Sequence, residues 1–396
     1  MRALHLPVWI GSVRRSRAAP FAVLFAIFTF LRALLVTVLP LNALALLGDA
    51  SSVSLLYFGA SLIGIATTFS IPWLVHRFRR RWVFTAGCAC SLSAALLLAE
   101  GTVPFFIVGL FLHMAAVAMI EVTSNLYVLD HIPRDQLGRF EPLRMFSMAG
   151  PWAFAPWLGV YLRTSVVEWA PFVTVCVTAI FLAGYFWYLR LTDDPAVAAA
   201  KGPAPSIFRN IRRYSVQPRL VLAWALAFGR SSWWVMFFVY GPLIAVGAGL
   251  GEDTAGLIAS LGSAMLFMVP LWGWVARRIG LKRLLAIGYS ASAVATVAMV
   301  FLFDLPDWVA VTLVVAAFST GIIDTAGNLP FLRAVRSWER PAMTSVFSTY
   351  RDLSQLVPPG IFFMVLKVLP LPAIFVLSGT SMLVLSYYCR YLPRRL

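Results

Sequence analysis

The chain has 396 residues, of which 61% are hydrophobic and only 12% are charged, and its formal net charge is +16. A soluble protein carries roughly 25% charged residues, so this chain cannot coat a water-exposed surface and lipid must be its main solvent. The charge does not indicate a nucleic-acid partner, because no basic stripe with interleaved aromatic residues lies on a polar background.

Apolar runs of bilayer length begin close to the N-terminus. A bilayer core needs about 20 apolar residues per helix. By that criterion the first half of the chain has six such runs, at 20–41, 53–72, 82–99, 103–128, 142–162 and 169–191. Arg14, Arg15 and Arg17 precede the first run, as in a signal peptide. That run is too long for a signal peptide and leads into further spans, so we interpret it as a retained first helix.

A polar stretch at 192–218 divides the chain and predicts a flexible cytoplasmic linker. Six further apolar runs follow it, at 219–241, 254–276, 283–303, 308–330, 342–365 and 372–391. The chain is therefore predicted to be an all-α integral membrane protein with about 12 transmembrane helices.

The loop charges are distributed unevenly between the two sides of the predicted membrane. One set of alternate loops, together with both termini, holds nearly all the arginines and lysines outside the apolar runs, whereas the opposite loops hold only Arg163 and Lys367. This bias places the basic loops and both termini in the cytoplasm of a cell with an inner membrane. The high net charge then reflects topology and attraction to anionic lipid.

An internal repeat relates the two halves. Glu121-Val-Thr-Ser-Asn125 in the fourth run is matched 203 positions later by Asp324-Thr-Ala-Gly-Asn328 in the tenth. Gly48 and Gly251, in the first outer loop of each half, have the same offset. We therefore predict two pseudo-symmetric six-helix bundles, residues 1–191 and 219–396, joined by the linker at 192–218.

The loop after the second run of each half carries a motif. In the second half, residues 273–283 read Gly-Trp-Val-Ala-Arg-Arg-Ile-Gly-Leu-Lys-Arg. The first-half copy, residues 72–81, reads Pro-Trp-Leu-Val-His-Arg-Phe-Arg-Arg-Arg. Both copies are similar to the Gly-x-x-x-Asp-Arg-x-Gly-Arg-Arg/Lys signature of the major facilitator superfamily of secondary transporters. The chain resembles that superfamily over essentially its whole length.

The resemblance implies that these loops latch the two halves at the cytoplasmic face. His76 stands where the family has its acid, and Arg79 replaces the turn glycine. The acid of the latch would then come from Asp130, Asp135 or Glu141. The latch residues expected from the resemblance are Arg77, Arg81, Arg277, Gly280 and Arg283.

Two arginines lie near the middle of corresponding apolar runs, Arg32 in the first and Arg230 in the seventh. In superfamily members that carry organophosphates and other anions, an arginine on each of these helices meets the substrate. The resemblance therefore implies that Arg32 and Arg230 bind substrate, since the guanidinium group stays charged and binds carboxylate or phosphate with two hydrogen bonds. We expect no acid at their depth on a neighbouring span. Trp233 and Trp234 follow Arg230 within a turn and either stack on the substrate or pack in the core; of the two, Trp233 is expected in the substrate site.

The acids Glu121 and Asp324 are expected to lie below the arginines as coupling or gating groups, because ionisable groups within spans mark solute and proton pathways. An alternative is that Glu121 pairs with Arg144 and Asp324 with Arg351 within each half. The remaining expected residues are Asn125, Asn328 and Gln355 in the substrate cavity, and Arg144, Arg351 and Asp352 with the coupling acids.

These patterns favour a monomeric secondary transporter that moves a small organic solute, anionic or polar, by proton-coupled alternating access. Two alternatives stay open, a multidrug efflux antiporter and a non-transporting receptor or assembly factor with the same scaffold. We expect no enzyme, because nucleophile-elbow, P-loop and zinc-protease motifs are missing from the sequence. Neither cofactor nor metal is expected, since His113 and the four cysteines lack ligand spacing.

Overall fold

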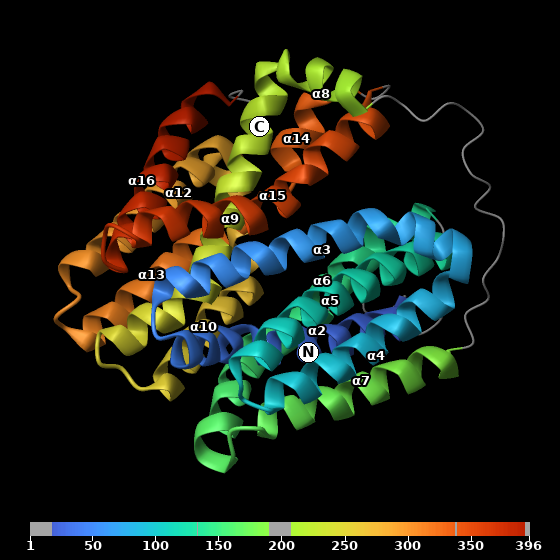
Figure 1. The fold of residues 1–396 in the computed structure, drawn as a ribbon. Helices are drawn as coiled ribbons and strands as arrows, with labels where there is room; N and C mark the ends of the chain where they lie inside the picture. The colour runs from blue at the N-terminus through green and yellow to red at the C-terminus, as the bar shows by residue number, and fades with distance from the viewer. Residues whose placement is uncertain (1–17, 133, 190–206, 337–338, 393–396) are drawn as a thin grey trace, which may run out of the picture. The chain divides into compact units, whose positions relative to one another are not determined.

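The computed structural model describes residues 18–132, 134–189, 207–336 and 339–392, and all regular elements in these ranges are helices (Figure 1). The basic residues before Ala18 and linker residues 192–206 lie outside the described ranges. The first half contains α2 (Ala18–Leu47), α3 (Ala50–Phe78), α4 (Arg80–Ala99), α5 (Val103–His131), α6 (Arg134–Tyr161) and α7 (Ala170–Tyr188), with the π-helical turn η1 (Leu162–Val166) before α7.

The second half begins with a short helix, α8 (Ile207–Ser215), within the stretch that we expected to be a flexible linker. Two expected runs are interrupted: 254–276 falls into three segments, and 308–330 is divided in two. The elements after α8 are α9 (Pro218–Gly247), α10 (Glu252–Ala264), η2 (Met265–Met268), α11 (Val269–Ile279), α12 (Leu281–Phe301), α13 (Pro306–Asp324), α14 (Leu329–Ala334), α15 (Arg340–Leu366), α16 (Pro372–Tyr388) and η3 (Cys389–Tyr391).

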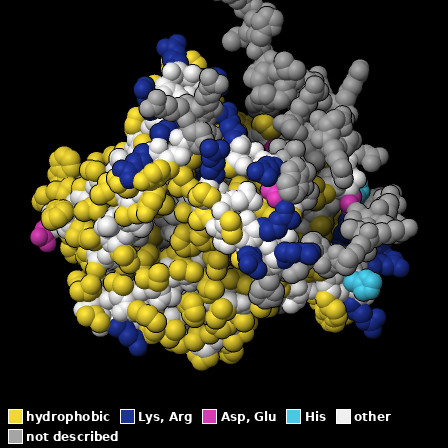
Figure 2. Space-filling model, turned by 90° about the horizontal axis from the view of Figure 1, so that it is seen from above, with side chains coloured by type: hydrophobic (Ala, Val, Ile, Leu, Met, Phe, Trp, Pro, Cys, Tyr) yellow, Lys and Arg dark blue, Asp and Glu magenta, His cyan; other side chains and the backbone are white. Residues whose placement is uncertain are grey.

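The described residues include ten segments that are long and apolar enough to cross a membrane. Two more helices, α6 with 28 residues and α15 with 27, have the length but are more polar. At about 1.5 Å per residue, either helix is longer than a hydrocarbon core of about 30 Å. Hydrophobic side chains cover much of the face seen in Figure 2. The chain is a multi-pass membrane protein with about twelve membrane helices.

Contacts divide the chain into two compact units, which are described separately. Unit 1 comprises Met1–Leu39 and Leu62–Lys201, and unit 2 comprises Pro40–Ser61 and Gly202–Leu396. In unit 2, the buried Tyr240 hydroxyl donates to Ser54 Oγ over 2.8 Å, and Ser61 Oγ donates to the main-chain oxygen of Gln355 over 2.8 Å. The boundaries 1–191, 192–218 and 219–396 remain a prediction.

The two units repeat one packing arrangement. In unit 1, α4 packs along α5 and α7, and in unit 2, α12 packs along α13 and α16. A Cβ atom added to Gly87 of α4 would lie 2.9 Å from Ile120 Cγ1, and one added to Gly288 of α12 would lie 2.9 Å from Ile323 Cγ1. Glycine therefore lets each helix pair approach closely. The next residue after each isoleucine is one of the membrane acids, Glu121 or Asp324.

Candidate functional site

In each unit an arginine of the first membrane helix pairs with an acid of the fourth. In unit 1, Arg32 Nη1 of α2 lies 3.5 Å from Glu121 Oε2 of α5. In unit 2, Arg230 Nε of α9 lies 3.3 Å from Asp324 Oδ1 of α13. The expectation that no acid lies at the depth of these arginines is therefore wrong. The internal repeat thus produces an arginine–acid pair at matching positions of both units.

The pair in unit 2 is nearly closed off. Arg230 and Asp324 expose 11% and 18% of their side chains, so both charges have lost most of their water. Trp234 Nε1 donates to Asp324 Oδ2 over 2.9 Å, and Arg230 Nη1 donates to the main-chain oxygen of Gly327 over 3.5 Å. These hydrogen bonds offset part of the free energy that is lost when both charges are removed from water.

The helix of unit 2 is broken next to this pair. Helix α13 ends at Asp324, and α14 begins at Leu329 after a turn in which Gly327 has a φ of +48°. The matching position in unit 1 is Ser124, and there α5 continues unbroken to His131. Because glycine adopts positive φ without steric cost, its presence at 327 permits the turn. The break leaves the Gly327 carbonyl free of helical bonding and available to Arg230.

The pair in unit 1 is more open. Arg32 and Glu121 expose 37% and 31% of their side chains, whereas the corresponding residues of unit 2 expose 11% and 18%. The guanidinium group of Arg32 lies 5.9 Å from the centre of the Trp152 ring, within the range of a cation–π contact. An arginine held this way keeps donors available for a solute that carries a carboxylate or phosphate.

Below the open pair, a second arginine engages the predicted cavity amide. Arg144 Nη1 donates to Asn125 Oδ1 over 2.8 Å, and Arg144 Nη2 lies 2.5 Å from Glu141 Oε1. The Arg144 guanidinium group also lies 5.0 Å from the centre of the Phe25 ring. Arg144 therefore links α5 to its own helix α6, while Glu121 pairs with Arg32.

The two adjacent tryptophans of α9 have different surroundings. Trp233 is 1% exposed, donates from Nε1 to Thr296 Oγ1 over 2.9 Å and stacks on Phe237. Trp234 reaches Asp324 instead and stacks on Phe238. Sequence reasoning singled out Trp233 for the site, yet Trp234 is the one that contacts the ion pair. The four-residue spacing from Arg230 to Trp234 was the available signal, because it places both on one helix face.

The remaining predicted residues of unit 2 are less closely connected to the pair. Asn328 is exposed and occupies the residue before α14. On α15, Arg351 is exposed, whereas Asp352 and Gln355 are half-buried. The partners of Asp324 described above, Arg230 and Trp234, both lie on α9.

The signature loops keep one backbone geometry despite their different sequences. Arg79, between α3 and α4, has φ 64° and ψ 154°, and Gly280, between α11 and α12, has φ 88° and ψ 143°. Arg80 pairs with Asp130 at the end of α5, so Asp130 is the acid that joins the first loop within unit 1. The Asp135 side chain lies outside the described residues. The predicted latch residues Arg77, Arg277 and Arg283 are exposed, and Arg81 is half-buried.

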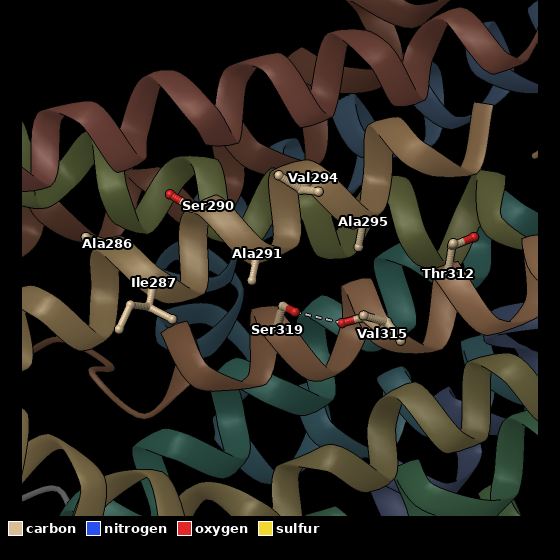
Figure 3. A pocket seen from close by; sticks show the side chains of 9 residues that line it. All are labelled: Ala286, Ile287, Ser290, Ala291, Val294, Ala295, Thr312, Val315 and Ser319. Atoms are coloured by element: carbon tan, nitrogen blue, oxygen red, sulfur yellow. Dashed lines mark hydrogen bonds between the residues drawn. The ribbon is translucent and has the colours of Figure 1, made fainter. Parts of the chain in front are cut away.

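One open hollow of unit 2 is lined by residues other than these charged pairs. It is an open groove with a volume of about 690 Å³ along α12 and α13, and Figure 3 shows its small and apolar lining, with Ser319 Oγ bonded to its own helix at Val315. A much smaller hollow of unit 2 touches Arg230, Tyr289 and Gly327. Within the described ranges, no group of three or more metal-ligating side chains is found.

Solved transporters share this fold. A POT family transporter in complex with 5-aminolevulinic acid superposes with a TM-score of 0.74 at 10% identity, covering 94% of each chain. A peptide transporter POT in complex with sulfate gives 0.72 at 12% identity, covering 94% of this chain and 93% of that one. The nucleoside transporter NupG gives 0.69 at 13% identity, covering 95% and 98%. No curated protein matches the chain by sequence.

At these identities the structural likeness establishes the fold of membrane transporters and nothing finer. The family model of the Major Facilitator Superfamily matches residues 21–359, which is most of the chain. The chain belongs to the Major Facilitator Superfamily. This family and its fold are those of transporters rather than of enzymes.

Proposed function

We propose that the chain is a secondary active transporter that moves a small organic solute, anionic or polar, by proton-coupled alternating access. The observation that carries the proposal is the pair of matched arginine–acid contacts, Arg32 with Glu121 and Arg230 with Asp324. Charges within membrane helices are costly, and they are retained where a solute or proton passes. The family and the fold support transport as the general activity.

The two pairs have different roles in this proposal. The open pair of unit 1 meets the solute, and Arg32 binds its anionic group in place of Glu121. The enclosed pair of unit 2 responds to the proton, since a protonated Asp324 no longer holds Arg230 by charge and Arg230 becomes available to the solute. Trp234, rather than the buried Trp233, lies beside the solute. The residues completing the cavity are Asn125, Asn328 and Gln355, with Arg144, Arg351 and Asp352 as further charges of the pathway.

The location proposed for the protein is the inner membrane, with both termini in the cytoplasm, and the proposed working form is a monomer. The support is the distribution of basic residues, which lie in alternate loops. The partners proposed are protons, the lipid bilayer and one small-molecule substrate.

The test is transport by purified protein in liposomes with an imposed pH gradient. A thermal-shift screen first selects a solute, because at one ligand concentration a tighter ligand raises the melting temperature more. The panel contains peptides, nucleosides and 5-aminolevulinic acid, in line with the similar peptide and nucleoside transporters, together with organic phosphates and drugs. A rate of solute uptake that is the same with and without the pH gradient would contradict proton coupling.

The variants Asp324→Asn and Asp307→Asn separate coupling from general damage. Asp307 lies in the exposed first turn of α13, outside the ion pair, and serves as the matched control. We expect Asp324→Asn to abolish gradient-driven accumulation while solute exchange at equal pH persists, and we expect Asp307→Asn to behave as the natural chain. Arg32→Ala should abolish solute binding. Unchanged affinity in Arg32→Ala and in Arg230→Ala would refute the anion site.

Multidrug efflux is the second candidate. It is favoured by the aromatic rings beside both pairs, Trp152 near Arg32 and Trp234 with Phe238 near Asp324. An efflux protein should be stabilised by many unrelated amphipathic compounds in the thermal-shift screen, and a metabolite carrier by few. The Arg32→Ala variant gives a second distinction, because cationic drugs should keep their affinity when the arginine is removed.

A further inference from the structure

Two buried polar side chains of unit 1 have no hydrogen-bond partner among the described residues. Ser91 of α4 is fully buried and His113 of α5 is 3% exposed, and neither Ser91 Oγ nor His113 Nδ1 is hydrogen-bonded. Both residues lie near the middle of apolar helices long enough to cross a membrane. An unpaired polar atom at this depth is costly, because the hydrocarbon core holds no bulk water. Each atom therefore requires a partner that the neighbouring side chains do not supply.

Ser91 lies on the face of α4 that contacts α5. A Cβ atom added to Gly87 would lie 3.4 Å from the main-chain oxygen of Ala116 on α5. One added to Gly109 of α5 would lie 3.1 Å from the main-chain oxygen of Ala94 on α4. Ser91 follows Gly87 by four residues and precedes Ala94 by three. Because residues three and four apart share one helix face, Ser91 belongs to this contact.

His113 occupies the matching place on α5. It follows Gly109 by four residues and precedes Ala116 by three, so it lies on the face that contacts α4. The two glycine contacts therefore bracket Ser91 on one helix and His113 on the other. The unpaired atoms of both residues belong to the same level of one helix interface.

Unit 2 shows how this interface is satisfied by a direct hydrogen bond. Ser292 of α12 follows Gly288 by four residues, as Ser91 follows Gly87, and it is fully buried as well. Its Oγ atom lies 2.8 Å from Thr320 Oγ1 of α13. The hydroxyl of the α12 serine thus has a partner on the facing helix.

The corresponding hydroxyl is missing from α5. The position that matches Thr320 is Val117, since each lies three residues before the isoleucine that meets the glycine. A valine side chain neither donates nor accepts a hydrogen bond, so Ser91 has no direct partner there. The polar group one turn away on the same face of α5 is His113.

We propose that Ser91 Oγ and His113 Nδ1 bind one water molecule between α4 and α5. Buried waters join polar groups that do not reach each other, and a water supplies both the donor and the acceptor that a hydroxyl and a ring nitrogen need. Arg32 lies within electrostatic range of His113, so a neutral ligand suits this site better than a cation. The water takes the place of the direct bond between Ser292 and Thr320.

The consequence for unit 1 is a fixed orientation of the His113 ring. A ring nitrogen that is hydrogen-bonded determines which way the imidazole faces and which nitrogen carries the proton. The ring is thereby held in one position near Arg32, the arginine of the more open pair. This site depends neither on the identity of the solute nor on proton coupling.

The test is a double-mutant cycle on the thermal unfolding of the full chain in detergent. The variants are Ser91→Ala, His113→Leu and the two combined. His113→Gln keeps a hydrogen-bonding group at the same position. The matched control is Ser292→Ala, which removes a directly bonded hydroxyl from the equivalent place in unit 2.

We expect Ser91→Ala and His113→Leu each to lower the melting temperature by about 2–4 °C, because the water loses a partner. The combined variant should lose clearly less than the sum, since either change alone releases the shared water. His113→Gln should lose less than His113→Leu. Ser292→Ala should also lower the melting temperature, and its effect should add fully to that of His113→Leu.

A higher melting temperature in Ser91→Ala would overturn the proposal, because removing a polar group that is buried without a partner stabilises a protein. Full additivity of Ser91→Ala and His113→Leu would also overturn it, since the two side chains would then have separate partners. If His113→Leu does not fold, His113→Phe completes the cycle, because it keeps a ring and removes both nitrogens. The same two outcomes then decide.

Discussion

Arg79 has a backbone conformation that ordinarily belongs to glycine. Its φ of 64° and ψ of 154° fall in a region that is nearly closed to side chains. Gly280 has almost the same angles at the matching turn of the second half. A residue forced into such a region costs of order 1–3 kcal/mol, and the cost is tolerated only where the surroundings determine the turn. Here α3 and α4 determine it from both sides.

The variant Arg79→Gly is expected to raise the free energy of unfolding by about 1 kcal/mol, because it relieves strain but gives the unfolded chain more freedom. Thermal unfolding in detergent measures the change. Arg77→Gly, in the last turn of α3, is the matched control and should lower stability by about 1 kcal/mol. A loss of stability at both positions would show that Arg79 is not strained.

The sequence was sufficient to predict some residues of the candidate site, but not the contacts between them. The repeat identified Glu121, Asp324, Arg32 and Arg230 as notable residues, because an ionisable group in an apolar run is visible by itself. Their pairing was not visible, since the partners are about ninety positions apart in the chain and the rotation of a uniformly apolar helix leaves no trace in its periodicity. The contact of Trp234 was accessible through its spacing from Arg230.

Among the elements, the helix pairs α4–α5 and α12–α13 each have a glycine at the contact beside the membrane acid. Gly87 and Gly288 face Ile120 and Ile323, and no side chain fits between them without displacement. Because an acid follows each isoleucine, the distance between the helices also sets the position of the acid relative to its arginine. Packing and charge position are thus linked in both units.

The variant Gly288→Ala should destabilise the protein by about 1–3 kcal/mol, since the added Cβ overlaps Ile323 Cγ1 and Ile322. Gly184→Ala on α7 is the control, because open space surrounds that position and alanine favours the helix. Melting temperature in detergent gives the comparison. Equal behaviour of the two variants would disprove close packing at Gly288.

The sequence analysis did not predict where helices are interrupted. The run 308–330 is apolar throughout, so its hydropathy predicts one helix, yet the structure divides it after Asp324. Gly327 and Asn328 lie inside the run that was interpreted as one helix, although glycine and asparagine are also the residues that favour turns. Similarly, α8 was not recognised within the polar linker because its apolar residues are few and arginines separate them.

For the whole molecule, length and hydropathy were sufficient for the membrane fold with about twelve helices. Helices α6 and α15 are more polar than the ten spans recognised in the described residues. Their apolar runs, 142–162 and 342–365, were nevertheless long enough to predict both helices. Contacts group Pro40–Ser61, the end of α2 and the start of α3, with unit 2. No change of composition in the sequence marks this division.

The predicted topology places Thr102 and Ser215 on opposite sides of the membrane. Both are exposed, Thr102 before α5 and Ser215 at the end of α8. In a chain with its native cysteines replaced, we expect Thr102→Cys to react with an impermeant maleimide added to intact cells, and Ser215→Cys to react only after permeabilisation. The expectation rests on the basic loops being cytoplasmic. Labelling of both positions from one side would exclude this topology.

The arginine–acid pairs also bear on how the protein is made. Arg32 emerges from the ribosome long before the second half exists, and Glu121 lies in the same unit. An arginine in lipid without a partner is costly. Because its partner arrives with the fourth membrane helix, unit 1 can neutralise its own charge while the rest of the chain is still being synthesised. Each unit can therefore insert into the membrane with its buried arginine already paired. In unit 2 the pair is Arg230 with Asp324.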